Sequence, residues 1–151
     1  MTKDIEAIRK ILPHRYPFLM IDRVLEVREG EYCKAVKNVT INEQIFQGHF
    51  PEMAVFPGVL QLEAMAQTSA FIIDSVMPED HGLMVFYAGV NNAKFRKQVV
   101  PGDQLVIEST LANRKKQFWV FHAKAFVDEK VVPPYNVPKP SYRPHFQKYR
   151  R

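Results

Sequence analysis

The sequence contains a single cysteine, Cys33, among its 151 residues. One cysteine excludes a disulfide bond within the chain and a metal site made of several cysteines. Several common motifs are also absent: GxGxxG and the P-loop for nucleotides, HExxH for zinc and GxSxG for a nucleophilic serine. Because Cys33 lies in the middle of a predicted strand, we expect it to be a structural residue rather than a nucleophile.

The chain also lacks a long apolar run, and none approaches the roughly 20 residues that a membrane-spanning helix requires. The N-terminal segment, MTKDIEAIRKIL, includes two acidic side chains and no small-residue cleavage site, so it does not resemble a secretory signal. We therefore expect no membrane span and a cytoplasmic location. The length predicts one domain, since 151 residues are enough for a single hydrophobic core.

Acidic residues are missing from one end of the chain. Residues 133–151 hold five of the 21 basic residues, five prolines and no acid, whereas basic and acidic residues are equal in number over residues 1–132. We predict a folded domain over residues 1–132 and an extended or disordered basic tail, rich in proline and aromatic residues, over residues 133–151. The tail leaves one other function open, a module that binds nucleic acid or an acidic protein.

The rest of the sequence predicts an α+β fold. Apolar residues at helical spacing predict a short helix over residues 3–12 and a long helix that starts at Pro57 and Gly58 and ends near Met77. Val- and Ile-rich segments predict a hairpin over residues 18–40, with its turn near Gly30, and β-rich segments over residues 83–100, 103–114 and 116–132. Strands that flank one dominant helix indicate a mainly antiparallel sheet.

His49 lies in a loop that contains glycine and proline, in the sequence QGHFPEM. Glycine and proline restrict the loop to unusual backbone geometry, and a rigid loop can hold a side chain for chemistry. An exposed loop histidine without a function is the other interpretation. His122 alternates with apolar residues on a predicted strand, where we expect an ordinary sheet residue.

Glu63 lies on the predicted long helix, and helical periodicity places it on one face with Gln67 and Asp74. Periodicity alone favours a solvated polar stripe. Leu60 and Phe71 share this face, however, and apolar neighbours would favour the protonated form of a carboxyl group.

Gly58 stands at the predicted start of the same helix, where the first N–H groups have no partner within the helix. These groups form the positive end of the helix dipole. A glycine also lets a carbonyl oxygen approach the backbone closely, so an oxyanion site is available there. The alternative is a helix-start residue without a ligand.

Three segments, LPHRYPFLMIDRV, GHFPEMAVFPGVLQLEAMAQ and AKFRKQVVPGDQL, resemble in order and spacing the β-hydroxyacyl-acyl carrier protein dehydratases of the FabZ type. The resemblance implies a hot-dog fold, in which a curved antiparallel sheet wraps a long central helix. It also implies a homodimer, with commonly three such dimers in a hexamer. In that family the catalytic pair, here His49 and Glu63, is assembled from two different subunits, and the backbone N–H that matches Gly58 polarises the thioester carbonyl.

The implied reaction removes water from a 3-hydroxyacyl thioester on acyl carrier protein, in type II fatty acid biosynthesis. It needs a base for the C2 proton and an acid for the C3 hydroxyl, and it needs no metal or organic cofactor. Histidine suits the base because it titrates near neutrality, and a shielded glutamic acid suits the proton donor. Acyl-thioester hydrolysis, with a carboxylate that activates water, is the alternative reaction on this fold.

The substrate would need an apolar tunnel for its acyl chain and a basic surface for its acidic carrier protein. Arg96 and Lys97 are the candidates for carrier-protein docking, with a solvated strand end as the alternative. No nucleic-acid partner is expected of a dehydratase. The prolines of the tail should end the last strand near Val132. The expected tunnel residues, each of which could also be plain core, are Phe50, Met53, Val55, Phe56, Leu60 and Phe86.

Overall fold

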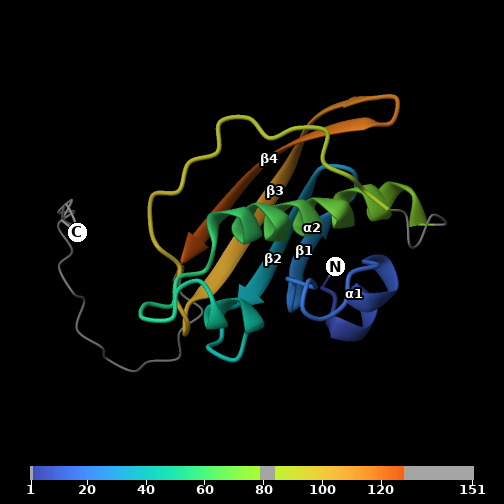
Figure 1. Ribbon diagram of the computed structural model, residues 1–151. Coiled ribbons are helices and arrows are strands. Elements are labelled where there is room, and N and C mark those ends of the chain that lie inside the picture. The colour runs from blue at the N-terminus through green and yellow to red at the C-terminus, as the bar shows by residue number, and fades with distance from the viewer. Residues whose placement is uncertain (1, 79–83, 128–151) are drawn as a thin grey trace, which may run out of the picture.

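The computed structural model describes residues 2–78 and 84–127. The four strands of the described part form one antiparallel sheet in the order β1-β2-β3-β4. Figure 1 shows this sheet curving around helix α2, which packs against all four strands. A curved antiparallel sheet around one long helix is the predicted hot-dog fold, so the α+β fold class is confirmed. In chain order the elements are α1 (Ile5–Ile11), β1 (Arg23–Arg28), β2 (Tyr32–Asn38), the 3-10 helix η1 (Gln44–Gln47), α2 (Gly58–Val76), β3 (Gln104–Lys115) and β4 (Phe118–Val127).

Both predicted helices form where the sequence places them. Helix α1 begins after Asp4, whose side chain accepts a hydrogen bond from the N–H of Ala7 at 3.0 Å, and it ends before Pro13. Helix α2 has 19 residues, which corresponds to a length of about 28 Å. Its N-cap is Pro57, so the chain enters the helix at the predicted proline.

The core lies between α2 and the concave face of the sheet. Strand β2 contributes Cys33 and Ala35 and strand β3 contributes Ile107, all at 0% exposure, and α2 contributes Phe71 and Ile72. Alternate residues of a strand point to the same face, which explains this selection. His122 lies on β4, as predicted for a sheet residue.

Two polar contacts attach the sheet to α2. The hydroxyl groups of Ser69 and Ser109 lie 2.7 Å apart inside the core. At the β1–β2 turn, the N–H of Gly30 donates to the hydroxyl of Ser75 at 2.9 Å. Gly30 has a φ of +67°, a conformation that favours glycine, so the predicted turn residue is confirmed.

The β structure predicted for residues 83–100 is wrong over the part of it that the structure describes. Residues 84–100, called the crossing segment below, contain no helix or strand and run past α2 instead. The sequence has strand composition, but a strand needs a hydrogen-bonded neighbour, and within the described residues this segment pairs with none of the four strands. Its large exposed apolar side chains are Met84, Val85, Phe86, Tyr87, Val90, Phe95 and Val100.

The C-terminal predictions fall mostly on residues that the structure does not describe. Strand β4 is described as far as Val127. The predicted continuation to Val132 and the tail over residues 133–151 lie outside the described residues. Within the described residues, no helix is long and apolar enough to span a bilayer.

Candidate active site

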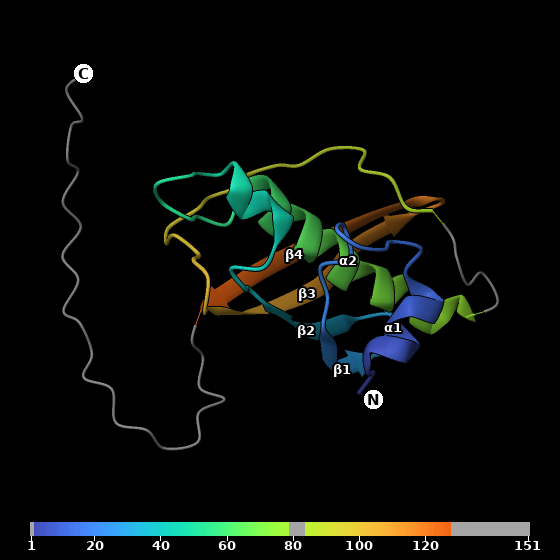
Figure 2. The same ribbon diagram turned by 60° about the horizontal axis from the view of Figure 1, so that its bottom comes forward.

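The loop that carries His49 is closed by its own hydrogen bonds. The N–H of His49 donates to the carbonyl of Ile45 at 2.9 Å, and Phe50 and Met53 exchange backbone hydrogen bonds at 2.9 and 3.1 Å. The N–H of Phe56 then donates to the carbonyl of Val99 at 2.7 Å, which attaches the loop to the end of the crossing segment. Figure 2 shows η1 and this loop beside the end of α2 where the helix begins. The sequence-based prediction of a restrained loop is confirmed.

The imidazole of His49 is held by a backbone carbonyl. Its Nδ1 lies 2.6 Å from the carbonyl oxygen of Val55. A carbonyl oxygen can only accept, so Nδ1 carries the hydrogen, and in the neutral ring Nε2 has a free lone pair. The ring also stacks on Phe50, with 4.0 Å between the ring centroids. His49 therefore presents Nε2 as a base.

Glu63 is shielded rather than solvated. Its side chain is 14% exposed, and its Oε1 accepts a hydrogen bond from Nε2 of Gln67 at 2.8 Å. Nε2 of His14 lies 3.4 Å from the same oxygen. The solvated polar stripe that periodicity favoured is wrong at Glu63 and Gln67, because the loop between α1 and β1 covers this face of the helix.

Gln67 connects this carboxyl group to the covering loop. It is 1% exposed, and its Oε1 accepts from the N–H of Met20 at 2.8 Å. Its Nε2 donates to the carbonyl of Phe18 at 2.8 Å as well as to Glu63. The N–H of Met20 can only donate, so its bond fixes the orientation of the Gln67 amide. The group of Gln67 that faces Glu63 must therefore be the NH₂ group, which donates to the carboxyl oxygen.

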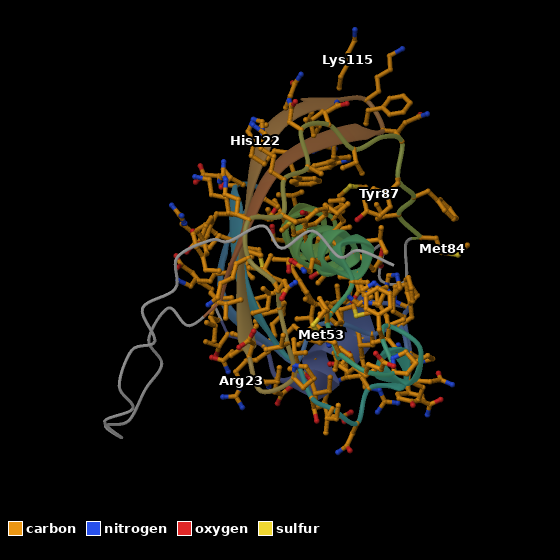
Figure 3. All side chains as sticks on the ribbon, turned by 60° about the vertical axis from the view of Figure 1, so that its left-hand side comes forward. Arg23, Met53, Met84, Tyr87, Lys115 and His122 are labelled. Atoms are coloured by element: carbon orange, nitrogen blue, oxygen red, sulfur yellow. The ribbon has the colours of Figure 1, made fainter. Side chains whose placement is uncertain are left out.

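Tyr87 approaches Glu63 from the crossing segment. Figure 3 shows α2 nearly end-on, with Tyr87 on the side of the helix remote from the sheet. The hydroxyl of Tyr87 donates to the carbonyl of Leu62 at 2.6 Å. Burial, and secondarily the charge of Glu63, raises the pKa of Tyr87 to about 12. This phenol therefore remains protonated and acts as a donor at neutral pH.

His49 and Glu63 are not partners within one chain. No hydrogen bond or ion pair joins these two described side chains, and each has other partners: Val55 for His49, and Gln67 and His14 for Glu63. Within one described chain, the imidazole of His49 and the shielded carboxyl group of Glu63 therefore have separate sets of partners.

Gly58 is the first residue of α2, as predicted, so its N–H belongs to the helix turn that lacks internal acceptors. A Cβ atom on this residue would lie 2.9 Å from Cζ of Phe95. The crossing segment thus packs an aromatic ring directly against the glycine, and only glycine leaves this space open.

The six expected tunnel residues differ widely in their burial within the described chain. Phe56 is buried in the core at 1% exposure, whereas Phe50, Met53 and Phe86 are exposed at 49%, 52% and 79%. Val55 and Leu60 are both half-buried. A cavity of about 40 Å³ lies elsewhere, between the end of α1 and the C-terminal half of α2.

Arg96 and Lys97, expected to dock the carrier protein, are both exposed on the crossing segment. The sequence interpretation did not single out His14, although it lies in the motif LPHRYPFLMIDRV. It also gave no role to Gln67 or Tyr87. Within the described residues, no three histidine, cysteine, aspartate or glutamate side chains form a metal-binding group.

Comparison with known proteins identifies the family. The model of the FabA-like domain matches residues 12–135. The 3-hydroxyacyl-[acyl-carrier-protein] dehydratase FabZ of Streptococcus thermophilus is 56% identical over 132 residues, which cover 87% of this chain and 92% of that protein. The protein of the same name from Lawsonia intracellularis is 50% identical over 134 residues, covering 87% and 88%. This chain belongs to the FabZ dehydratase family.

The fold of a FabZ dehydratase also has a counterpart among solved structures. The structure titled "The Dehydratase Heterocomplex ApeI:P from Xenorhabdus doucetiae" matches with a TM-score of 0.64 and 19% identity, and covers 81% of this chain and 82% of that chain. At this identity the likeness supports the fold alone. The family that the three sequence motifs predicted is confirmed by the FabA-like and FabZ matches.

Proposed function

We propose that this FabZ dehydratase converts (3R)-hydroxyacyl-acyl carrier protein to trans-2-enoyl-acyl carrier protein, a step of type II fatty acid biosynthesis. The observation that carries the proposal is the hydrogen bond between Nδ1 of His49 and the carbonyl of Val55, because it leaves Nε2 as a fixed base. The relatives named above, 50% and 56% identical, are dehydratases of such substrates by name.

In this reaction, Nε2 of His49 takes the proton from C2 of the thioester. The negative charge that develops on the thioester oxygen is stabilised by the N–H of Gly58 at the positive end of α2. Glu63 gives its proton to the C3 hydroxyl, which leaves as water. The shielding of Glu63 supports this role, because its side chain is only 14% exposed and the amide of Gln67 holds its carboxyl group in place.

The active unit that we propose is a homodimer, in which His49 of one chain meets Glu63 of the other. The separation of the two side chains within one chain supports this arrangement. So does the apolar surface around α2, where Phe86 is 79% exposed and Val59 is 71% exposed. Such side chains on neighbouring segments are typical of an interface. Three dimers would form the hexamer that the family resemblance implies.

The acyl chain of the substrate and its carrier protein would bind to different parts of the dimer. The acyl chain would lie in a tunnel that the second subunit completes. The expected lining residues are Phe50, Met53, Val55, Phe56, Leu60 and Phe86. Exposed Arg96 and Lys97 would receive the acidic carrier protein, as long-range attraction between opposite charges favours. We also propose that the reaction takes place in the cytoplasm.

Hydration of crotonyl or longer enoyl thioesters, the reverse reaction, tests the proposal. Wild type should consume the conjugated enoyl thioester without releasing free thiol, whereas a hydrolase would release thiol. His49→Ala and Glu63→Gln should each lower kcat by about 10² to 10⁴, the usual contribution of a general acid or base. Near-wild-type rates in both variants would overturn the proposal, as would release of thiol by the wild type.

A further inference from the structure

The two oxygens of the Glu63 carboxyl group have different surroundings. Oε1 accepts from the Gln67 amide, whose orientation is fixed by Met20, and it also faces Nε2 of His14 at 3.4 Å. An oxygen that accepts hydrogen bonds is the carbonyl-type oxygen of a carboxylic acid, so the acidic proton belongs on Oε2. The proton donor of the proposed reaction is therefore one particular oxygen.

The tautomer of His14 follows from its other nitrogen. Nδ1 is buried and has no hydrogen-bond partner among the described residues. A hydrogen on Nδ1 would be a buried donor without an acceptor, which is costly, so the hydrogen belongs on Nε2 and points toward Glu63. The His14 ring is tilted against Phe18, with 5.9 Å between ring centroids.

Other ionisable groups surround this contact. Arg15 donates to the carbonyl of His14 at 2.7 Å, and Asp74 lines the same small cavity as His14. The hydroxyl of Tyr87, from the crossing segment, is a donor to the backbone of α2 next to Glu63. Of these groups, only His14 offers a side-chain N–H to the carboxyl oxygen itself, in addition to the amide of Gln67.

We propose that His14 is a positioning residue that, with Gln67, keeps Oε1 of Glu63 as an acceptor and so directs the transferable proton to Oε2. In the reaction, the Oε2–H bond breaks as an O–H bond forms on the C3 hydroxyl, and water leaves with the electron pair of the C3–O bond. The electron pair of the C2–H bond forms the double bond, and His49 keeps the C2 proton. The N–H of His14 then stabilises the Glu63 carboxylate. This inference rests on the proposed function.

Three variants separate hydrogen bonding from packing. His14→Phe keeps a ring against Phe18 without an N–H, His14→Gln keeps an N–H donor, and His122→Ala is the control on the sheet. His14→Phe should lower kcat about tenfold with KM within about twofold, since the lost donor stabilises the carboxylate rather than the substrate. His14→Gln should stay within about threefold of wild type for both constants. Equal loss in the Phe and Gln variants would overturn the proposal.

A second measurement does not depend on activity. In protein labelled with ¹³C at glutamate carboxyl groups, the Glu63 signal, assigned with Glu63→Gln, should lose its proton about one pH unit higher in His14→Phe than in wild type. His14→Gln should titrate close to wild type. Identical midpoints in wild type and His14→Phe would refute the role of His14. A wild type that fails to hydrate enoyl thioesters would instead refute the proposed function and leave this titration result standing.

Discussion

His49 and Val55 bind each other twice. The N–H of Val55 donates to the carbonyl of His49 at 3.1 Å, and Nδ1 of the His49 ring donates to the carbonyl of Val55 at 2.6 Å. One bond closes the loop and the other orients the ring, so the same pair of residues determines both the shape of the loop and which ring nitrogen is free to accept a proton. Structure and chemistry at His49 can therefore be separated by substitution.

His49→Asn should keep the bond to Val55 but lose the base. The side-chain amide of asparagine can place an N–H near the position of Nδ1, and it has no basic nitrogen. We expect kcat to fall by a factor of about 10² to 10⁴ in both His49→Asn and His49→Ala. Only His49→Ala should also lower the free energy of unfolding, by about 1 kcal/mol, because it loses the hydrogen bond to Val55. Urea denaturation and enoyl thioester hydration measure the two effects. Equal stability of the two variants would contradict the structural part.

Gly58→Ala should impair catalysis more than folding. The new Cβ would lie 2.9 Å from the ring of Phe95, which is 53% exposed and can shift. If the N–H of Gly58 forms the proposed oxyanion site, the methyl group and the displaced ring should lower kcat by roughly tenfold, with a change in stability under about 1 kcal/mol. Gly48→Ala is the matched control, since its Cβ would meet no atom within 4 Å. Similar kinetics in both variants would argue against an oxyanion site at Gly58.

Lys37 of β2 and Glu43, the N-cap residue of η1, form a buried ion pair. Their Nζ and Oε2 atoms lie 3.0 Å apart, and the side chains are only 6% and 20% exposed. Removing Glu43 takes away the carboxylate that forms the ion pair with the shielded Lys37 ammonium, so Glu43→Gln should lower the free energy of unfolding by about 2–3 kcal/mol. The exposed pair of Arg9 and Glu6, at 3.6 Å, is the control.

The control substitution, Glu6→Gln, should change the unfolding free energy by less than about 0.5 kcal/mol. Urea denaturation measures both variants. The double variant Lys37→Met with Glu43→Gln should recover part of the loss, because it leaves no unpaired charge. A Glu43→Gln variant as stable as Glu6→Gln would show that the buried pair does not stabilise the fold.

The burial of the Cys33 thiol should make the protein less stable at alkaline pH. Burial raises the pKa of its thiol from the ordinary value of 9.0 to about 12. Above pH 9 the unfolded chain releases a proton that the folded chain retains, so stability is full below pH 9 and falls by up to about 1.4 kcal/mol per pH unit as the pH rises toward 12. Tyr32 and Tyr87, whose pKa values are also raised to about 12, add smaller losses above pH 10, because both side chains are partly exposed and solvent screens their interactions.

Urea denaturation between pH 8.5 and 10 isolates the contribution of Cys33. Cys33→Ala should be less stable than wild type at every pH because it leaves a cavity, but its stability should vary less with pH in this range. Parallel pH profiles of wild type and variant would contradict the burial of the thiol.

Local patterns predicted most of the fold. The helices, the hairpin at Gly30 and strands β3 and β4 depend on periodicity and on turn residues within a few positions of each other. The crossing segment was mispredicted because a strand exists only beside a partner, and its composition could not tell that α2, rather than a sheet edge, lies next to it in this chain.

The site was predictable only in part for the same reason. His49 and Gly58 are recognisable from their own neighbours in the sequence. The surroundings of Glu63 depend on His14 and on a loop whose residues Phe18 and Met20 contact Gln67. These contacts are 49 and 47 residues apart along the chain. Helical periodicity therefore predicted a solvent-exposed Glu63, and the family motif indicated a catalytic residue. The fold shows that the carboxyl group is shielded.

The central claim, a dehydratase site shared between two chains, is tested by mixing His49→Ala with Glu63→Gln. A hybrid dimer would contain one site with both native side chains, so a fully exchanged equimolar mixture should regain about a quarter of the wild-type rate of enoyl thioester hydration. Native mass spectrometry verifies the exchange. A mixture with confirmed hybrids that is no more active than the separate variants would contradict the account.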